Sequence, residues 1–123
     1  MLAVAAVNIL EYGLGFSAQE WSLLALGSAV SFATECLDRL HSTAQAHKRI
    51  MVVEVMGRYA GWIALHAGVA GSADVILIPE IPFSYEAVAA RVRERVNEGM
   101  LFSIIAVSEG AKPAGGAQVF SRG

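Results

Sequence analysis

The chain has 123 residues and a mass of 13.0 kDa, which suits one modest domain. It is 55% hydrophobic, a composition that excludes a disordered polypeptide, which is polar and rich in charge. Nine basic and eleven acidic residues give a net charge of −2, so no positive excess indicates binding to nucleic acid or to a membrane surface. Only 16% of the residues are charged, against about 25% in average domains. This low value predicts that part of the surface packs against a partner subunit or against further sequence.

Neither the cysteine content nor the apolar stretches indicate secretion or a membrane protein. Cys36 is the single cysteine, which excludes an internal disulfide and suits a reducing, cytoplasmic compartment. It has no CxxC partner, so we expect it to serve packing rather than nucleophilic chemistry. The apolar run at residues 1–10 is too short to span a bilayer and lacks the basic start of a signal peptide. The apolar stretch at residues 21–33 is bracketed by acidic residues, and we expect it to form core or interface.

The first two predicted elements are a helix and then a strand. Residues 1–18 show no clean period, whereas residues 20–47 have helical periodicity. The apolar positions recur at steps of three and four residues: Val30, Ala33, Leu37 and Leu40. Residues 50–55 then form a short apolar, β-branched run, which predicts a strand buried on both faces. A turn at residues 56–61 leads into an apolar helix at residues 62–70.

The strand and helix pattern then repeats. Residues 75–78 predict a second buried strand, and Ser84 is placed to cap the next helix, which Gly99 ends. We expect a valine stripe of this helix to be buried and its charged residues to face water: Val88, Val92 and Val96 inside, and Arg91, Arg93, Glu94, Arg95 and Glu98 outside. Residues 102–107 predict a third strand.

This alternation predicts an α/β fold with a parallel sheet, flanking helices and right-handed crossovers. The carboxyl ends of parallel strands line one edge of the sheet, and ligands bind at that edge in open α/β folds. Here the edge carries residues 56–58 after the first strand, Glu80 after the second and Glu109 after the third. One cation, turn amides and two carboxylates are therefore expected at one crevice.

The residues at this edge suit a phosphorylated ligand. Gly57 permits a tight turn and close approach, and Arg58 offers a planar fork for phosphate oxygens, although the arginine could also simply pair with a carboxylate. Glu109 can accept hydrogen bonds from sugar hydroxyls or cap a loop, and Glu80 is expected to be structural. Arg49 precedes the first strand and so lies at the opposite edge, as a solvated charge or as a residue that reaches the site of a neighbouring subunit.

Other catalytic signatures are missing. His41, His47 and His66 are not spaced as metal ligands, and we expect His66 to be a core or interface residue. The sequence contains no GxxxxGK[ST], GxGxxG, HExxH or GxSxG motif, and no aspartate at the crevice to act as a base. Taken alone, the residues indicate a sugar-phosphate-binding or nucleotide-binding piece of an α/β protein.

A family resemblance extends this interpretation. Residues 47–68, HKRIMVVEVMGRYAGWIALHAG, closely resemble the fructose 6-phosphate-binding segment of the 6-phosphofructokinases. Residues 35–41, 73–80 and 102–110 (ECLDRLH, ADVILIPE and FSIIAVSEG) are similar to that family in the same order. The resemblance runs over residues 28–119 and implies a partial, Rossmann-like phosphofructokinase fold.

The resemblance divides the chain and assigns roles. It leaves an unassigned apolar segment at 1–27 and a tail at 120–123 around the fructose 6-phosphate-binding region at 28–119. The binding residues that it implies are Met56, Gly57 and Arg58 on the phosphates, Glu109 on the sugar hydroxyls and Arg49 across a subunit interface. It therefore also implies a homo-oligomer, a dimer or a tetramer. His41 stands where some bacterial members have an effector-site arginine, so that type of regulation is not expected.

The resemblance further implies phosphoryl transfer from ATP or pyrophosphate, with Mg²⁺, to fructose 6-phosphate. The family's Gly-Gly-Asp-Gly and Thr-Ile-Asp-Asn-Asp segments, which hold the donor, the metal and the general base, have no counterpart in residues 1–27. A misread or frameshifted start would explain that segment. We therefore expect no catalytic residue and no metal site in this chain, and negligible turnover by the chain alone. The sequence of residues 59–65 resembles the pyrophosphate-dependent or mixed branch of the family more than the short allosteric bacterial one.

Two other interpretations remain open. The chain is alternatively a stand-alone sugar-phosphate-binding or interaction module without kinase activity. A third possibility is a truncated product that does not fold stably, because an uncovered sheet edge favours aggregation.

Overall fold

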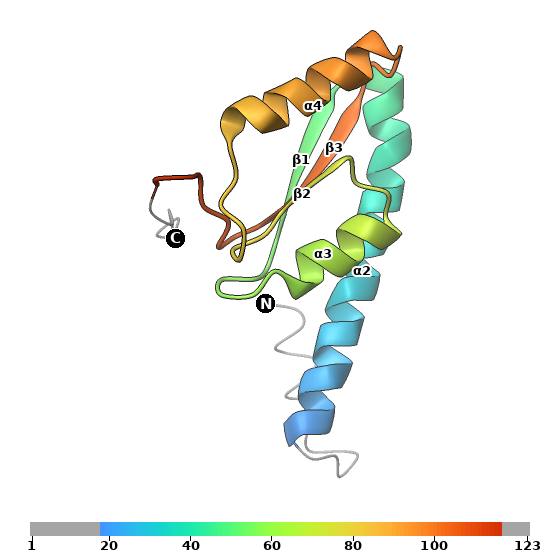
Figure 1. Ribbon diagram of the computed structural model, residues 1–123. Coiled ribbons are helices and arrows are strands. Elements are labelled where there is room, and N and C mark those ends of the chain that lie inside the picture. The colour runs from blue at the N-terminus through green and yellow to red at the C-terminus, as the bar shows by residue number, and fades with distance from the viewer. Residues whose placement is uncertain (1–17, 117–123) are drawn as a thin grey trace.

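The computed structural model describes residues 18–116. Its elements, in chain order, are α2 (Ala18–His47), β1 (Ile50–Val55), α3 (Trp62–Ala70), β2 (Val75–Leu77), α4 (Tyr85–Asn97) and β3 (Ser103–Ser108) (Figure 1). The strands pair in parallel in the order β1-β3-β2. This confirms the predicted parallel α/β sheet with flanking helices. The predicted division between residues 27 and 28 falls inside α2, and the tail at 120–123 lies outside the described residues.

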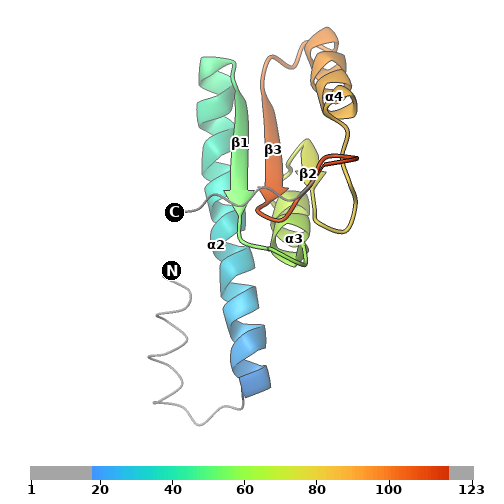
Figure 2. The same ribbon diagram turned by 90° about the vertical axis from the view of Figure 1, so that its left-hand side faces the viewer.

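The core lies between the sheet and the pair α2 and α3. Its buried residues come from both helices and from the central strand: Ala33, Leu37, Ala44, Ile63, Ala67 and Ile104. Figures 1 and 2 show these two helices on one side of the sheet and α4 on the other. None of the helices within residues 18–116 is both long and apolar enough to cross a membrane. The apolar stretch at residues 21–33 is instead part of the long helix α2, in which Leu23, Leu24 and Leu26 are exposed and Ala33 is buried in the core.

The prediction that the first strand is buried on both faces was wrong for the described part of the chain. Met51, Val53 and Val55 pack against the core, but the alternate residues are open, with Ile50 54% and Val52 64% exposed. The reason is position, because β1 is an edge strand of the sheet and α4 lies on the side of β2, away from β1 (Figure 2). The continuous apolar run predicted that both faces of β1 are covered, but residues 18–116 cover only one of them.

The ends of α4 are as predicted. Ser84 caps the helix, because its hydroxyl oxygen accepts a hydrogen bond from the Ala87 amide at 3.3 Å. The same hydroxyl donates to the Glu86 carboxylate at 2.8 Å and so lowers the pKa of Glu86. Gly99 has φ +88° and follows the last turn, where its amide donates to the Val96 carbonyl at 3.0 Å.

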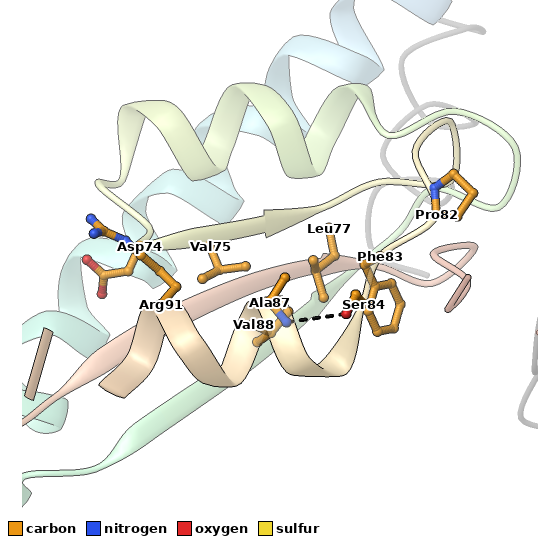
Figure 3. A pocket seen from close by; sticks show the side chains of 9 residues that line it. All are labelled: Asp74, Val75, Leu77, Pro82, Phe83, Ser84, Ala87, Val88 and Arg91. Atoms are coloured by element: carbon orange, nitrogen blue, oxygen red, sulfur yellow. Dashed lines mark hydrogen bonds between the residues drawn. The ribbon is translucent and has the colours of Figure 1, made fainter. Parts of the chain in front are cut away.

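The predicted valine stripe of α4 is only half confirmed. Val88 and Val92 are half-buried, and Val96 is 46% exposed. The helix stands away from β2, and an open pocket of about 490 Å³ separates them (Figure 3). Its lining comes from both elements and the segment that joins them: Asp74, Val75, Leu77, Pro82, Phe83, Ser84, Ala87, Val88 and Arg91.

Arg95 does not face water as predicted. Its guanidinium pairs with the Asp74 carboxylate at 2.9 Å, and both side chains are nearly buried, at 13% and 11% exposed. The other Asp74 oxygen accepts from the Ile104 amide at 2.8 Å, and the Arg95 Nε donates to the Ser103 hydroxyl at 3.3 Å. This network fixes α4 to the amino ends of β2 and β3. The helix period alone did not reveal it, because the partner lies 21 residues earlier in the chain.

Candidate functional site

The carboxyl ends of two of the predicted strands lie side by side. β1 and β3 are parallel neighbours, and Val55 lies in register with Ser108, so both strands end side by side (Figure 2). Beyond them, the Glu109 amide donates to the Val55 carbonyl at 3.0 Å, and the Gly110 amide donates to the Gly57 carbonyl at 3.1 Å. The turn after β1 and Glu109 therefore form one surface, as the parallel arrangement predicts.

The turn after β1 requires glycine. Gly57 has φ +151°, which L side chains rarely adopt, and an added Cβ would lie 2.7 Å from the Ala60 carbonyl oxygen and overlap the Ser108 hydroxyl. Arg58 is exposed, and its guanidinium carbon lies 5.6 Å from the centre of the Tyr59 ring. The turn thus presents a cation at the surface beside a close-packed backbone.

Glu109 and Glu80 lie in different surroundings. Glu109 is exposed, and its carboxylate can accept hydrogen bonds at the edge of the sheet. Glu80 accepts a hydrogen bond from the Gly61 amide at 2.9 Å and so fixes the residue before α3. The structural role predicted for Glu80 is confirmed, and the Gly61 amide is not available to an anionic ligand.

Arg49 lies at the amino ends of the strands, opposite the turn after β1. Its amide donates to the Ala44 carbonyl at 3.1 Å, and its own carbonyl accepts from the Ser103 amide at 3.4 Å, so its backbone is held where β1 begins. Seven residue steps separate it from Met56, which is roughly 23 Å of extended strand. The structure therefore does not bring the Arg49 side chain to the turn after β1 within its own chain.

Two of the three histidines, His41 and His66, make side-chain contacts within the described residues. The His41 Nε2 lies 2.8 Å from the Gly71 carbonyl oxygen, and the ring meets Phe102 edge-on at 6.1 Å, so it ties α2 to the end of α3. His66 stacks on Trp62 at 5.4 Å, and both rings are exposed. His66 is therefore not a core residue of the described part, while an interface role stays a prediction.

No metal site is found within residues 18–116, which hold no group of three or more His, Cys, Asp or Glu residues placed to bind an ion. The carboxylate of Glu80 is engaged by a backbone amide, and Glu109 stands as a single carboxylate at the turn. Mg²⁺ prefers an octahedral set of oxygen ligands. The side chains of residues 18–116 do not supply such a set by themselves.

Two residues at the site carried little signal in the sequence. Ser108 is 1% exposed, and its hydroxyl donates to the Gly57 carbonyl. Gly110 packs against the backbone of Arg58, where an added Cβ would overlap the carbonyl oxygen. One indication of their importance was present in the sequence: a polar residue ends an apolar strand and is followed by Glu and Gly. The open pocket between β2 and α4 contains none of the predicted site residues (Figure 3).

The sequence is similar to known phosphofructokinases. The profile of the family described as Phosphofructokinase matches residues 23–122. An ATP-dependent 6-phosphofructokinase of Chloroflexus aurantiacus is 61% identical over 93 residues, which are 76% of this chain and 26% of that protein. A pyrophosphate–fructose 6-phosphate 1-phosphotransferase of Amycolatopsis methanolica is 62% identical over 96 residues, which are 78% of this chain and 28% of that protein.

Solved structures of phosphofructokinases also resemble this chain. Phosphofructokinase from Saccharomyces cerevisiae superposes with a TM-score of 0.69 and 36% identity, over 76% of this chain and 13% of that one. A pyrophosphate-dependent phosphofructokinase from Marinobacter aquaeolei gives 0.63 and 31%, over 69% of this chain and 24% of that one. The chain spans about a quarter of the length of the curated relatives it matches. Because the family profile covers most of the sequence and the fold agrees, this chain belongs to the phosphofructokinase family.

Proposed function

We propose that the chain supplies the fructose 6-phosphate-binding part of a 6-phosphofructokinase. The complete reaction transfers a phosphoryl group from ATP or pyrophosphate to fructose 6-phosphate and gives fructose 1,6-bisphosphate, a cytoplasmic step of glycolysis. The observation that supports this most strongly is the joining of the turn at Gly57 and Arg58 to Glu109 by backbone hydrogen bonds at the carboxyl edge of the sheet.

The proposed roles follow from the chemistry of these groups. The Arg58 guanidinium can donate two parallel hydrogen bonds to phosphate oxygens and can stabilise the negative charge of the transferring phosphoryl group. Glu109 accepts hydrogen bonds from sugar hydroxyls, and Met56, which is 53% exposed, lies against the ligand beside Gly57. Phosphoryl transfer depends on this kind of positioning and charge stabilisation more than on covalent chemistry by the protein.

Arg49 is proposed to act on the 6-phosphate in a neighbouring subunit of a homo-oligomer. Its place at the far edge of the sheet supports this, as do large exposed apolar side chains on α2, such as Leu23 at 70% and Phe32 at 67%. The donor is proposed as ATP or pyrophosphate, since curated relatives of both kinds match the chain. Mg²⁺ is proposed as the metal ion, but the described residues do not form its site.

A second candidate is a sugar-phosphate-binding module without kinase activity. The observation in its favour is that residues 18–116 by themselves hold the turn after β1 and Glu109 together. Both candidates require the same binding site, so measurement of binding tests what they share.

Calorimetric titration with fructose 6-phosphate tests the proposal. The Arg58→Ala variant is expected to bind about 10-fold to 100-fold more weakly, because charge-assisted hydrogen bonds to the phosphate contribute roughly 1.5–3 kcal/mol. Arg93→Ala is the matched control, since it removes the same charge from an exposed position on α4. Equal weakening by both variants would show nonspecific attraction of an anion and would contradict the proposed site.

A further inference from the structure

Ser108 is a buried polar residue that the proposed binding contacts do not use. It is the last residue of β3, the residue is 1% exposed, and its hydroxyl donates to the carbonyl of Gly57, 51 residues earlier. A buried hydroxyl is costly unless it is hydrogen-bonded, so the Gly57 carbonyl compensates for its burial. The bond therefore ties the end of β3 directly to the turn that carries Arg58.

Ser108, at the end of β3, and the two residues that follow it form hydrogen bonds to the end of β1 and to the turn after it. The Ser108 hydroxyl and the Gly110 amide, at 3.1 Å, both donate to the Gly57 carbonyl, and between them the Glu109 amide donates to Val55 at 3.0 Å. Glu109 thus lies between two residues that hold the same carbonyl oxygen. Its backbone cannot shift relative to the turn at Gly57 unless these bonds break.

Close packing reinforces the hydrogen bonds. An added Cβ on Gly110 would overlap the Arg58 carbonyl oxygen and would lie 2.9 Å from that of Gly57. An added Cβ on Gly57 would overlap the Ser108 hydroxyl. The two turns therefore approach each other as closely as their backbones permit, which leaves little freedom in the separation of Arg58 and Glu109.

We propose that Ser108 and Gly110 are positioning residues that fix the phosphate-binding arginine and the sugar-binding carboxylate at a set distance from each other. The inference rests on the proposed function for the identity of the ligand, but the coupling of the two turns is a property of the chain alone. Binding that depends on two contacts to one small ligand is strongest when both contacts are held in place beforehand. The hydroxyl of Ser108 provides this constraint without touching the ligand.

The test compares Ser108→Ala with Ser103→Ala in the full chain. Ser103 is the matched control, because it is also 1% exposed and lies on the same strand, about 16 Å away, with its hydroxyl hydrogen-bonded to Arg95. Amide hydrogen exchange at Glu109 and Gly110, thermal unfolding and calorimetric binding of fructose 6-phosphate are measured for each variant. Ser108→Thr keeps the hydroxyl on a residue that suits a strand and serves as the rescue variant.

We expect Ser108→Ala to speed exchange at Gly110 about tenfold and to weaken binding of fructose 6-phosphate about fivefold to tenfold, the range of one net hydrogen bond. Ser103→Ala should change neither quantity, even if it lowers the unfolding temperature as much, and Ser108→Thr should restore both. The same exchange rate at Gly110 in Ser108→Ala and Ser103→Ala overturns the inference. Absence of binding by the unaltered chain overturns the proposed function instead, and the exchange comparison then decides the positioning role by itself.

Discussion

Replacement of Gly110 with alanine is expected to lower the free energy of unfolding by about 3 kcal/mol or more, because overpacking of a closely packed site costs about 1–3 kcal/mol and here the obstacle is backbone. The added Cβ would lie 2.6 Å from the carbonyl carbon of Arg58 and would overlap its oxygen. The turn after β3 must then move away from the turn after β1. Chemical denaturation followed by circular dichroism measures the loss.

Gly27→Ala is the matched control for this substitution. Gly27 lies inside α2, and a Cβ added there meets no atom within 4 Å. Alanine is favoured over glycine in a helix interior by about 0.5–1 kcal/mol, so this variant is expected to gain stability. A Gly110→Ala variant as stable as the unaltered chain would show that the two turns are not packed against each other as described.

Removal of the Asp74 carboxylate is expected to cost about 3–5 kcal/mol, the range found when one partner of a buried ion pair is deleted. Asp74→Ala leaves the Arg95 guanidinium, which is only 13% exposed, without its 2.9 Å partner. It also leaves the Ile104 amide, at the start of the central strand, without its side-chain acceptor. Thermal and chemical unfolding measure the effect, and α4 should show the largest rise in amide exchange.

Two further variants test whether the loss of stability comes from the Asp74–Arg95 pair or from the removal of any charge. Asp74→Ala combined with Arg95→Met removes both charges and should recover part of the lost stability, since no unpaired buried charge remains. Glu94→Ala breaks the exposed pair with Arg91 and should change stability far less. If Asp74→Ala is no more harmful than Glu94→Ala, the pair does not anchor α4.

The fold followed from the sequence because its signals are local. Alternating apolar runs and helical stripes predicted three parallel strands, and Ser84 and Gly99 marked both ends of α4 correctly. Parallel order then placed residues 56–58 and Glu109 at one edge without any knowledge of contacts. The family resemblance named the ligand that such an edge would bind.

The features that the sequence did not predict depend on contacts between distant residues. The exposure of Ile50 and Val52 follows from the place of β1 at the edge of the sheet, which an apolar run does not indicate. Arg95 fits the pattern of a solvated helix face, yet its side chain is only 13% exposed, because it pairs with Asp74. Ser108 contacts a carbonyl 51 residues away, and no local pattern announces such a bond.

Mapping of fructose 6-phosphate onto the chain by ¹⁵N–¹H chemical-shift titration tests the proposed binding site most directly. The predicted result is that the shifts concentrate at residues 56–58 and 108–110, and that they disappear in the Arg58→Ala/Glu109→Ala double variant. Shifts centred on the pocket between β2 and α4, at Phe83 and Ser84, would contradict the proposed site. So would a double variant that binds the sugar phosphate as tightly as the unaltered chain.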